Sequence, residues 1–170
     1  MGTLLLEEDL RTEGENSDVR LLARARTLAA LDGVSGYRKV RLLEFLSETK
    51  LIGSRGESPI ISLRFADLRN APLVRREILS YTDLEKAQLN NANMDKVKLI
   101  DTNLRGADLT GADLTGADLT GADLTKAILK DAEGGISCQE TEDAKSLEGA
   151  TMPNGQLYGA WLEGKDGCQK

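Results

Sequence analysis

The sequence predicts a mainly β fold in which the chain winds into stacked coils, with helical segments on its N-terminal side. Three observations lead to this prediction. Leucines recur at every fifth residue through residues 60–132, a small residue stands two positions before most of them, and residues 17–51 show a helical pattern instead. Internal periods are examined first because a missed repeat leads to the wrong fold for the whole chain.

The repeat is most regular at residues 106–125, which read GADLT four times without a gap. One extra residue interrupts the count between Leu73 and Leu84, where either Ile78 or Leu79 is the central residue. The predicted central core residues are Leu63, Leu68, Leu73, Leu84, Leu89, Met94, Leu99, Leu104, Leu109, Leu114, Leu119, Leu124 and Leu129. The predicted small core residues are Ala87, Ala92, Ala107, Ala112, Ala117, Ala122 and Ala127.

A period of five fits neither regular element. Residues five apart would scatter around an α-helix, and they would alternate between the two faces of a strand because five is odd. The pattern requires a corner in every five residues, so that four sides make one coil of about 20 residues. Successive coils would then stack at about 4.8 Å, with the leucines and small residues filling the interior.

Two amphipathic helices are predicted before the repeats, at residues 17–31 and 37–51. Ser17 is suited to cap the first helix, and Asp32-Gly33 supplies a turn between the two. The expected apolar stripe of the first helix contains Val19, Leu21, Leu22, Ala25, Leu28 and Ala29. That of the second helix contains Val40, Leu43, Phe45 and Leu46. We expect this hairpin to pack on the first coil, against Ile60, Ile61 and Phe65.

The expected organisation therefore has four parts. Residues 1–16 form a flexible or helical arm, 17–58 the helical cap, 59–132 the repeats, and 133–170 a polar loop with a C-terminal cap or tail. Residues 147–162 keep the five-residue step and could form a degenerate last coil, but Pro153-Asn154-Gly155 is typical of a turn. We favour a turn followed by a short helix.

Composition limits the chemistry. The 170 residues contain no histidine, which excludes His-based triads and His-ligated metal sites. The net charge is -6, and no segment is basic enough for binding a nucleic-acid backbone. No run of 18 apolar residues and no secretory signal pattern is present, so we expect a cytoplasmic protein without a membrane span in this sequence.

Cysteine is used sparingly. Cys138 and Cys168 are the two cysteines, and either two reduced thiols or a disulfide that closes the tail is compatible with their spacing. Two thiols without histidine cannot complete a four-ligand zinc site.

The GADLT units resemble the pentapeptide-repeat family, whose unit is A-(D/N)-L-x-x. The resemblance implies a right-handed quadrilateral β-helix of about three and a half coils over residues 59–132. Pro72, Val97 and Ile128 depart from the pattern, and residues 71–81 are expected to form a distorted side. The order of LARARTL, a leucine-rich helix and IISL is similar to cyanobacterial members, some of which carry membrane-anchoring helices upstream.

The aspartates of the four identical units do not predict a catalytic or metal site. Asp108, Asp113, Asp118 and Asp123 fall on four successive sides of a coil, so we expect them to bond the corner backbone. The sequence predicts no catalytic residue, no cofactor, no metal site and no small-molecule substrate.

A non-enzymatic scaffold that binds an unknown protein is therefore the main functional hypothesis, with a homodimer through an end coil as a further expectation. One alternative is a DNA mimic that inhibits a type II topoisomerase, as some family members do. Residues 60–132 carry ten basic and eleven acidic side chains, which is little charge for such a mimic. The other alternative is the soluble end of a membrane-tethered assembly.

Overall fold

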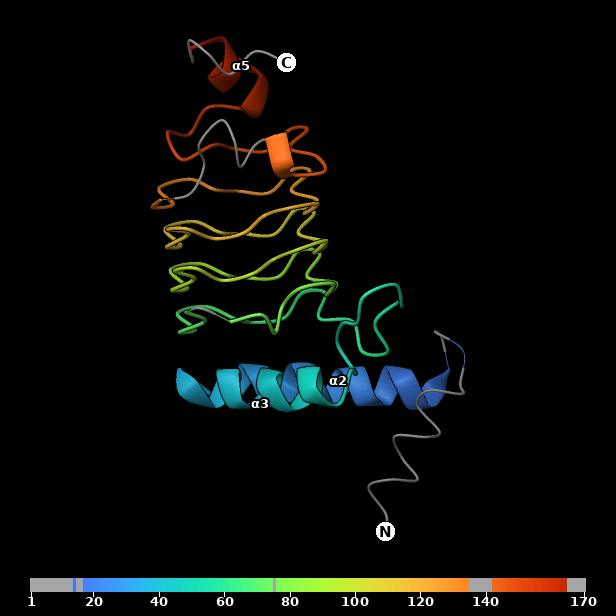
Figure 1. Cartoon of the computed structure of the whole chain (residues 1–170). Coiled ribbons are helices and arrows are strands. Elements are labelled where there is room, and N and C mark those ends of the chain that lie inside the picture. The colour runs from blue at the N-terminus through green and yellow to red at the C-terminus, as the bar shows by residue number, and fades with distance from the viewer. Residues whose placement is uncertain (1–13, 15–16, 75, 135–141, 165–170) are drawn as a thin grey trace.

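The computed structural model describes residues 14, 17–74, 76–134 and 142–164. The helices labelled in Figure 1 are α2 (Asp18–Asp32) and α3 (Tyr37–Glu48) before the coils and α5 (Tyr158–Glu163) after them. In Figure 1, α2 and α3 lie across one end of a stack of coils, and α5 lies at the opposite end. Between these ends the coils follow one another in the order of the sequence.

The first helix begins and ends where its local sequence directs. Ser17 is the N-cap of α2, and its Oγ accepts a hydrogen bond from the Arg20 backbone N–H at 3.3 Å. Asp18 lies in the first turn, where a negative charge interacts favourably with the helix dipole. Gly33 ends the helix and donates its N–H to the Ala29 carbonyl at 3.0 Å.

The face of α2 that packs on the coils differs from the expected apolar stripe. Five residues of that stripe are exposed, namely Val19, Leu21, Leu22, Ala25 and Ala29. Thr27 and Leu31 are buried instead. The reason is that the adjacent coil presents backbone carbonyl groups at this end, and the face that carries Arg24 supplies both donors and apolar contacts.

In α3 the expected face is partly right. Val40, Leu43 and Leu46 are buried, together with Lys39, whereas Phe45 is 50% exposed. Of the residues expected beneath the hairpin, Ile61 is buried and Ile60 packs against the core. Phe65 lies at a corner of the repeat with a φ of 65°, and it is 55% exposed beside α2.

Each repeat turns a corner through one local hydrogen bond. The Ala107 N–H donates to the Leu104 carbonyl at 3.0 Å, and Gly106 between them has a φ of 62°. A positive φ at the third residue of a β-turn is the condition that glycine meets without strain. The same position holds Lys86, Asn91 and Lys96 in other repeats, with φ between 54° and 57°.

The coils stack through isolated parallel β-bridges rather than through long strands. Asp83 pairs with Asn103, which is 20 residues further along the chain, and Asn103 pairs with Asp123. The intervening bridges are Gln88 with Asp108, Asn93 with Asp113 and Lys98 with Asp118, so one 20-residue turn carries four bridges. A corner in every five residues leaves no room for a longer ladder on one side.

The first turn contains one more residue than the turns between Asp83 and Glu133. Asp67 pairs with Gln88 and Pro72 with Asn93, both at a separation of 21, whereas Asp83 and Asn103 are separated by 20. Backbone pairing places the extra residue between Arg76, whose carbonyl accepts from Lys98, and Tyr81, whose N–H donates to Ile100. Leu79 is fully buried and Ile78 is not, which makes Leu79 the central residue there.

The interior of the stack is a column of leucine and alanine side chains. The predicted core residues of both kinds, from Leu63 to Leu129, are each exposed by 4% or less. Thr82, Thr102 and Val97 occupy the small position in three repeats and are also buried. The Thr102 hydroxyl is satisfied there because it donates to the Leu79 carbonyl at 2.8 Å.

The stack continues beyond residue 132. Ser146 pairs with Asp123 and Thr151 with Ile128, and Leu147, Ala150 and Met152 are buried. The chain then turns at residues 153–155, Leu157 pairs antiparallel with Thr151, and α5 begins. The segment therefore forms a further coil first, and then the turn and short helix that were its alternative. Cys138 and Cys168 lie outside the described residues.

Substitution of Leu104 by alanine tests the stacked core. We expect Leu104→Ala to lower the free energy of unfolding by about 2–5 kcal/mol, because the side chain is fully buried and a cavity would remain. Chemical denaturation followed by circular dichroism measures the change. Thr120→Ala, at an exposed corner, is the control, and equal losses for both variants would contradict the inward position of Leu104.

Substitution of Gly111 tests the corner geometry. We expect Gly111→Ala to destabilise the protein by about 1–2 kcal/mol, because L residues disfavour a left-handed backbone. The φ of Gly111 is 65°, and an added Cβ would lie 2.6 Å from Asn91 Oδ1. Gly159→Ala is the matched control, because that glycine lies in α5 with nothing within 4 Å of a Cβ. An unchanged midpoint for Gly111→Ala would contradict the corner assignment.

Candidate functional site

The aspartates of the identical repeats serve the corners. Asp108 Oδ1 accepts hydrogen bonds from the Thr110 backbone N–H at 3.0 Å and from the Thr110 hydroxyl at 2.6 Å. Asp118 and Asp123 form the same pair of bonds with the threonines two residues further on, and Asp113 accepts from the Thr115 N–H. Such local bonds are how aspartate stabilises a turn.

These bonds also affect ionisation. At Asp108 burial raises the pKa, but hydrogen bonds from Thr110 and Asn90 outweigh it, and the net pKa lies below the ordinary value. At Asp113 the bonds from Thr115 lower the pKa against a smaller opposing effect of burial. These aspartates therefore stay ionised at neutral pH as acceptors, and they lie on different sides of the coil.

Ion pairs connect neighbouring coils along the outside of the stack. Arg64 and Glu85 come within 2.7 Å, and Arg105 and Asp123 within 3.2 Å. On another side Lys98 pairs with Glu77, which raises the pKa of Lys98. Acidic and basic side chains of successive coils thus lie next to each other on the outer sides of the stack, and their opposite charges neutralise each other locally.

The junction between the cap helices and the first coil is held by basic side chains that donate to backbone carbonyls. In the next coil the carbonyls of Asp83, Glu85 and Gln88 accept from the coil before them. The equivalent carbonyls of the first coil belong to Ser62, Arg64 and Asp67, and among the described residues no earlier coil pairs with them. Arg24 donates to Ser62 O at 3.2 Å and Arg64 O at 3.0 Å, and Lys39 donates to Asp67 O at 2.7 Å.

Pro72 solves the same problem in another way. In the following coils, the backbone N–H at this position donates to an alanine carbonyl of the preceding coil. The Asn93 N–H donates to Ala71 O, and the Asp113 N–H donates to Ala92 O. Pro72 is the bridge partner of Asn93 and therefore occupies this position in the first coil. Since proline has no N–H, no donor is left without a partner there.

Asp67 is the ionic centre of the junction. Its carboxylate pairs with the buried Lys39 Nζ at 3.0 Å and with both donor groups of Arg69, at 3.0 and 2.8 Å. The hydrogen bonds from Arg69, followed by those from Lys39, hold the pKa of Asp67 far below its ordinary value despite the opposing effect of burial. Glu44 of α3 adds an ion pair with Arg76 at 2.5 Å.

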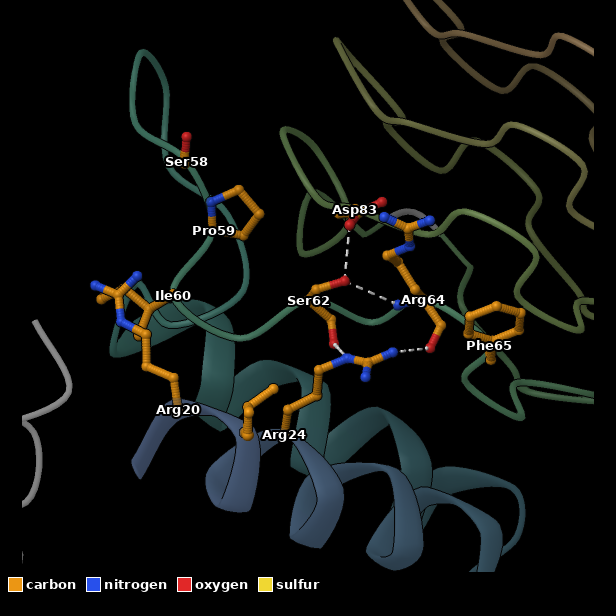
Figure 2. A pocket seen from close by; sticks show the side chains of 10 residues that line it. Arg20, Arg24, Ser58, Pro59, Ile60, Ser62, Arg64, Phe65 and Asp83 are labelled. Carbon is orange, nitrogen blue, oxygen red and sulfur yellow. Dashed lines mark hydrogen bonds between the residues drawn. The ribbon is translucent and has the colours of Figure 1, made fainter. Parts of the chain in front are cut away.

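A cleft opens beside this junction, between α2 and the first coil (Figure 2). Its volume is 590 Å³. The lining residues are Arg20, Leu21, Arg24, Ser58, Pro59, Ile60, Ser62, Arg64, Phe65 and Asp83. Figure 2 shows Ser62 at the centre of the wall, where its hydroxyl donates to Asp83 Oδ2 at 2.7 Å and accepts from the Arg64 N–H at 3.2 Å.

Phe65 separates this cleft from a smaller one. The smaller cleft has a volume of 280 Å³ and extends along α2 past Leu28 and Asp32. The Lys86 ammonium lies 5.5 Å from the centre of the Phe65 ring, an arrangement that favours cation–π attraction. Phe65 is therefore a wall of the clefts rather than part of the core.

The repeat segment matches a known family model. Residues 78–106 and 92–131 match the family described as pentapeptide repeats, with eight copies. Residues 78–131 are therefore a run of pentapeptide repeats. The match begins at the register change and leaves outside it the cap helices and every lining residue of the larger cleft except Asp83.

Two solved structures of pentapeptide-repeat proteins are similar to this chain. One is HetL from the cyanobacterium Nostoc sp. strain PCC 7120, which is described as involved in heterocyst differentiation regulation. It is 31% identical, with 58% of this chain and 52% of HetL covered and a TM-score of 0.29. The other, from the Arabidopsis thaliana thylakoid lumen, is 27% identical, with coverages of 59% and 69% and a TM-score of 0.26.

The matched segment thus spans about half the length of HetL. A search of the curated proteins finds no match.

Within the described ranges, no group of three or more Cys, Asp or Glu residues is placed to hold a metal ion. In the same ranges, no helix is both long enough and apolar enough to cross a membrane.

Sequence reasoning missed the residues that hold the pentapeptide stack to its cap. Lys39 and Arg24 read as ordinary solvated positions of amphipathic helices. One signal was present, because Lys39 shares a helical stripe with Leu43 and Leu46, where a charge is buried only with a partner. The partner, Asp67, is 28 residues away and could not be identified from spacing.

The ionic centre predicts a pH dependence. Because the folded pKa of Asp67 is lowered from 3.8, the pair contributes stability that is fully present above that value and is lost as pH falls below it. We expect the unfolding free energy of the wild type to fall more steeply than that of Asp67→Asn as the pH is lowered from about 4 to about 2. Urea titrations across this range provide the measurement.

Glu57→Gln is the control for that titration, because Glu57 is an exposed carboxylate that does not take part in the ion pairs of Asp67. Parallel pH profiles for the wild type and Asp67→Asn would contradict the role of Asp67.

Proposed function

We propose that this protein is a non-enzymatic protein-interaction module and that the 590 Å³ cleft between α2 and the first coil receives a segment of its partner. The cleft carries the proposal because it is the larger of the two hollows described, and its volume falls within the range of about 300–1,000 Å³ typical of ligand pockets. The cleft lies between α2 and the first coil, and the hydrogen bonds between successive coils make the stack behind it rigid.

The chemistry of the cleft favours binding rather than a reaction. Arg24 is engaged by two carbonyls and Arg64 by Glu85, so these cations shape the wall. The Ser62 hydroxyl is held in two hydrogen bonds, in a chain that contains no histidine. Leu21, Pro59, Ile60 and Phe65 contribute apolar surface, which suits an apolar side chain of a bound peptide.

The scaffold itself is inferred to be the right-handed quadrilateral β-helix of the pentapeptide-repeat family. Four bridges per 20 residues support the four-sided shape, and the handedness is taken from the family resemblance. We assign residues 17–58 to the cap, 59–132 to the main repeats and 133–170 to the C-terminal cap and tail. Each coil then presents four flat sides, which suits a rigid binding platform.

The distribution of charge does not favour a DNA mimic. A mimic needs a continuous negative surface, since duplex DNA carries one charge per about 1.7 Å of its axis. Here Arg64, Lys98 and Arg105 neutralise neighbouring carboxylates along the stack.

The partner site is tested by capture with matched variants. The immobilised protein is incubated with lysate of its native cell, and the bound proteins are identified and titrated as purified components. We expect Leu21→Glu to weaken binding of a specific partner by about tenfold or more, because it places a charge in the apolar part of the cleft.

Ile128→Glu is the control, because Ile128 is a comparably exposed aliphatic residue (40% against 49%) on the coils away from the cleft. Circular dichroism verifies that both variants keep the fold. A partner lost equally by both variants would place the binding surface elsewhere, and a partner unaffected by Leu21→Glu would exclude the cleft.

A further inference from the structure

We propose that the outer face of α2 binds a second copy of this chain, with the two α2 helices antiparallel and Leu22 at the twofold axis. The outer face is defined by Asp18, Val19, Leu22 and Arg26. It lies on another side of the helix from the residues that line the cleft, so this proposal stands independently of the partner site.

The apolar part of the face is left without a partner within the described residues. Leu22 and Leu31 are nine positions apart on α2, which places them about 180° apart around the helix. Leu31 is fully buried against the cap junction, while Leu22 is 53% and Val19 39% exposed. The helix therefore carries apolar side chains on two opposite faces, and only one of them is used inside the chain.

The charges of Asp18 and Arg26 favour a second copy of the chain as the partner of the outer face. Asp18 and Arg26 stand four residues before and after Leu22, which is about 6 Å in each direction along the helix axis. In an antiparallel pair centred on Leu22, Asp18 of one copy lies level with Arg26 of the other, and the twofold axis generates the same pairing again. A parallel pair would place like charges level with each other, so the charges favour the antiparallel arrangement.

Neither charged group is already committed. Within the part of the chain that the structure describes, Asp18 and Arg26 take part in no ion pair. Both residues are exposed. An intermolecular ion pair would therefore form without breaking one inside the chain.

The position of the face permits such a pair. Figure 1 shows the coils on one side of α2 and α3 only, so a helix docked on the opposite side meets no coil. The two stacks would then extend in opposite directions from a central layer of cap helices. The face is small, and we expect the association to be weak and dependent on concentration.

Analytical ultracentrifugation of the whole protein up to millimolar concentration tests the association. We expect the wild type to shift toward dimer with concentration and Leu22→Glu to remain monomeric. Leu21→Glu is the matched control, since Leu21 is exposed to a similar extent, 49%, but lies about 100° away around the helix. A wild type that is monomeric throughout, or dimers unaffected by Leu22→Glu, would overturn the proposal.

A charge exchange tests the antiparallel geometry. Asp18→Lys alone and Arg26→Glu alone each place like charges level with each other, and we expect each to weaken the dimer by about tenfold. An equimolar mixture of the two variants should recover the wild-type association, because each introduced charge then faces its opposite in the other copy. Failure of the mixture to recover would rule out this pairing, and circular dichroism verifies that each variant stays folded.

The outcomes also separate the two proposals. Leu21→Glu is expected to weaken partner capture and leave self-association intact, whereas Leu22→Glu is expected to do the reverse. The failure of one proposal therefore leaves the other open to its own experiment.

Discussion

Backbone hydrogen bonds between coils run along the axis of the stack, and much of the remaining structure follows from that direction. Within the stack, the carbonyl of Asp108 accepts from Leu89 and the N–H of Asp108 donates to Ala87, so each coil satisfies the one before it. The first and last coils have a neighbour on one side only. Because buried backbone groups without partners cost free energy, both ends need other groups to pair with them.

The two ends meet this need with different groups. At the N-terminal end, side chains from α2 and α3 reach the coil: Arg24 and Lys39 donate to three of its carbonyls, and Pro72 removes a donor. At the C-terminal end the backbone folds back on itself, so that Tyr158 N–H donates to Ala150 O and Met152 N–H to Gln156 O. The first solution places Arg24 in the wall of the larger cleft.

The interior and the corners could be predicted from sequence because their information is local. A five-residue period determines both which side chain points inward and where the chain turns, and the pairs expected from a 20-residue coil are the observed bridges, such as Gln88 with Asp108. The junction could not be predicted in this way. Which face of α2 packs inward depends on carbonyl groups at Ser62 and Arg64, about 40 residues away, and helical periodicity contains no information about them.

The four identical units at residues 106–125 amount to one complete circuit of the stack. Without them Arg105 would be followed directly by Lys126, which has the same left-handed backbone (φ 60°) as Gly106 (φ 62°). The stack would then lose one coil and become about 4.8 Å shorter, while the segments at both ends of the stack stay unchanged. Loss or duplication of this block in a gene would therefore alter the height of the molecule in whole steps, while the cap, the cleft and the closing helix keep their places.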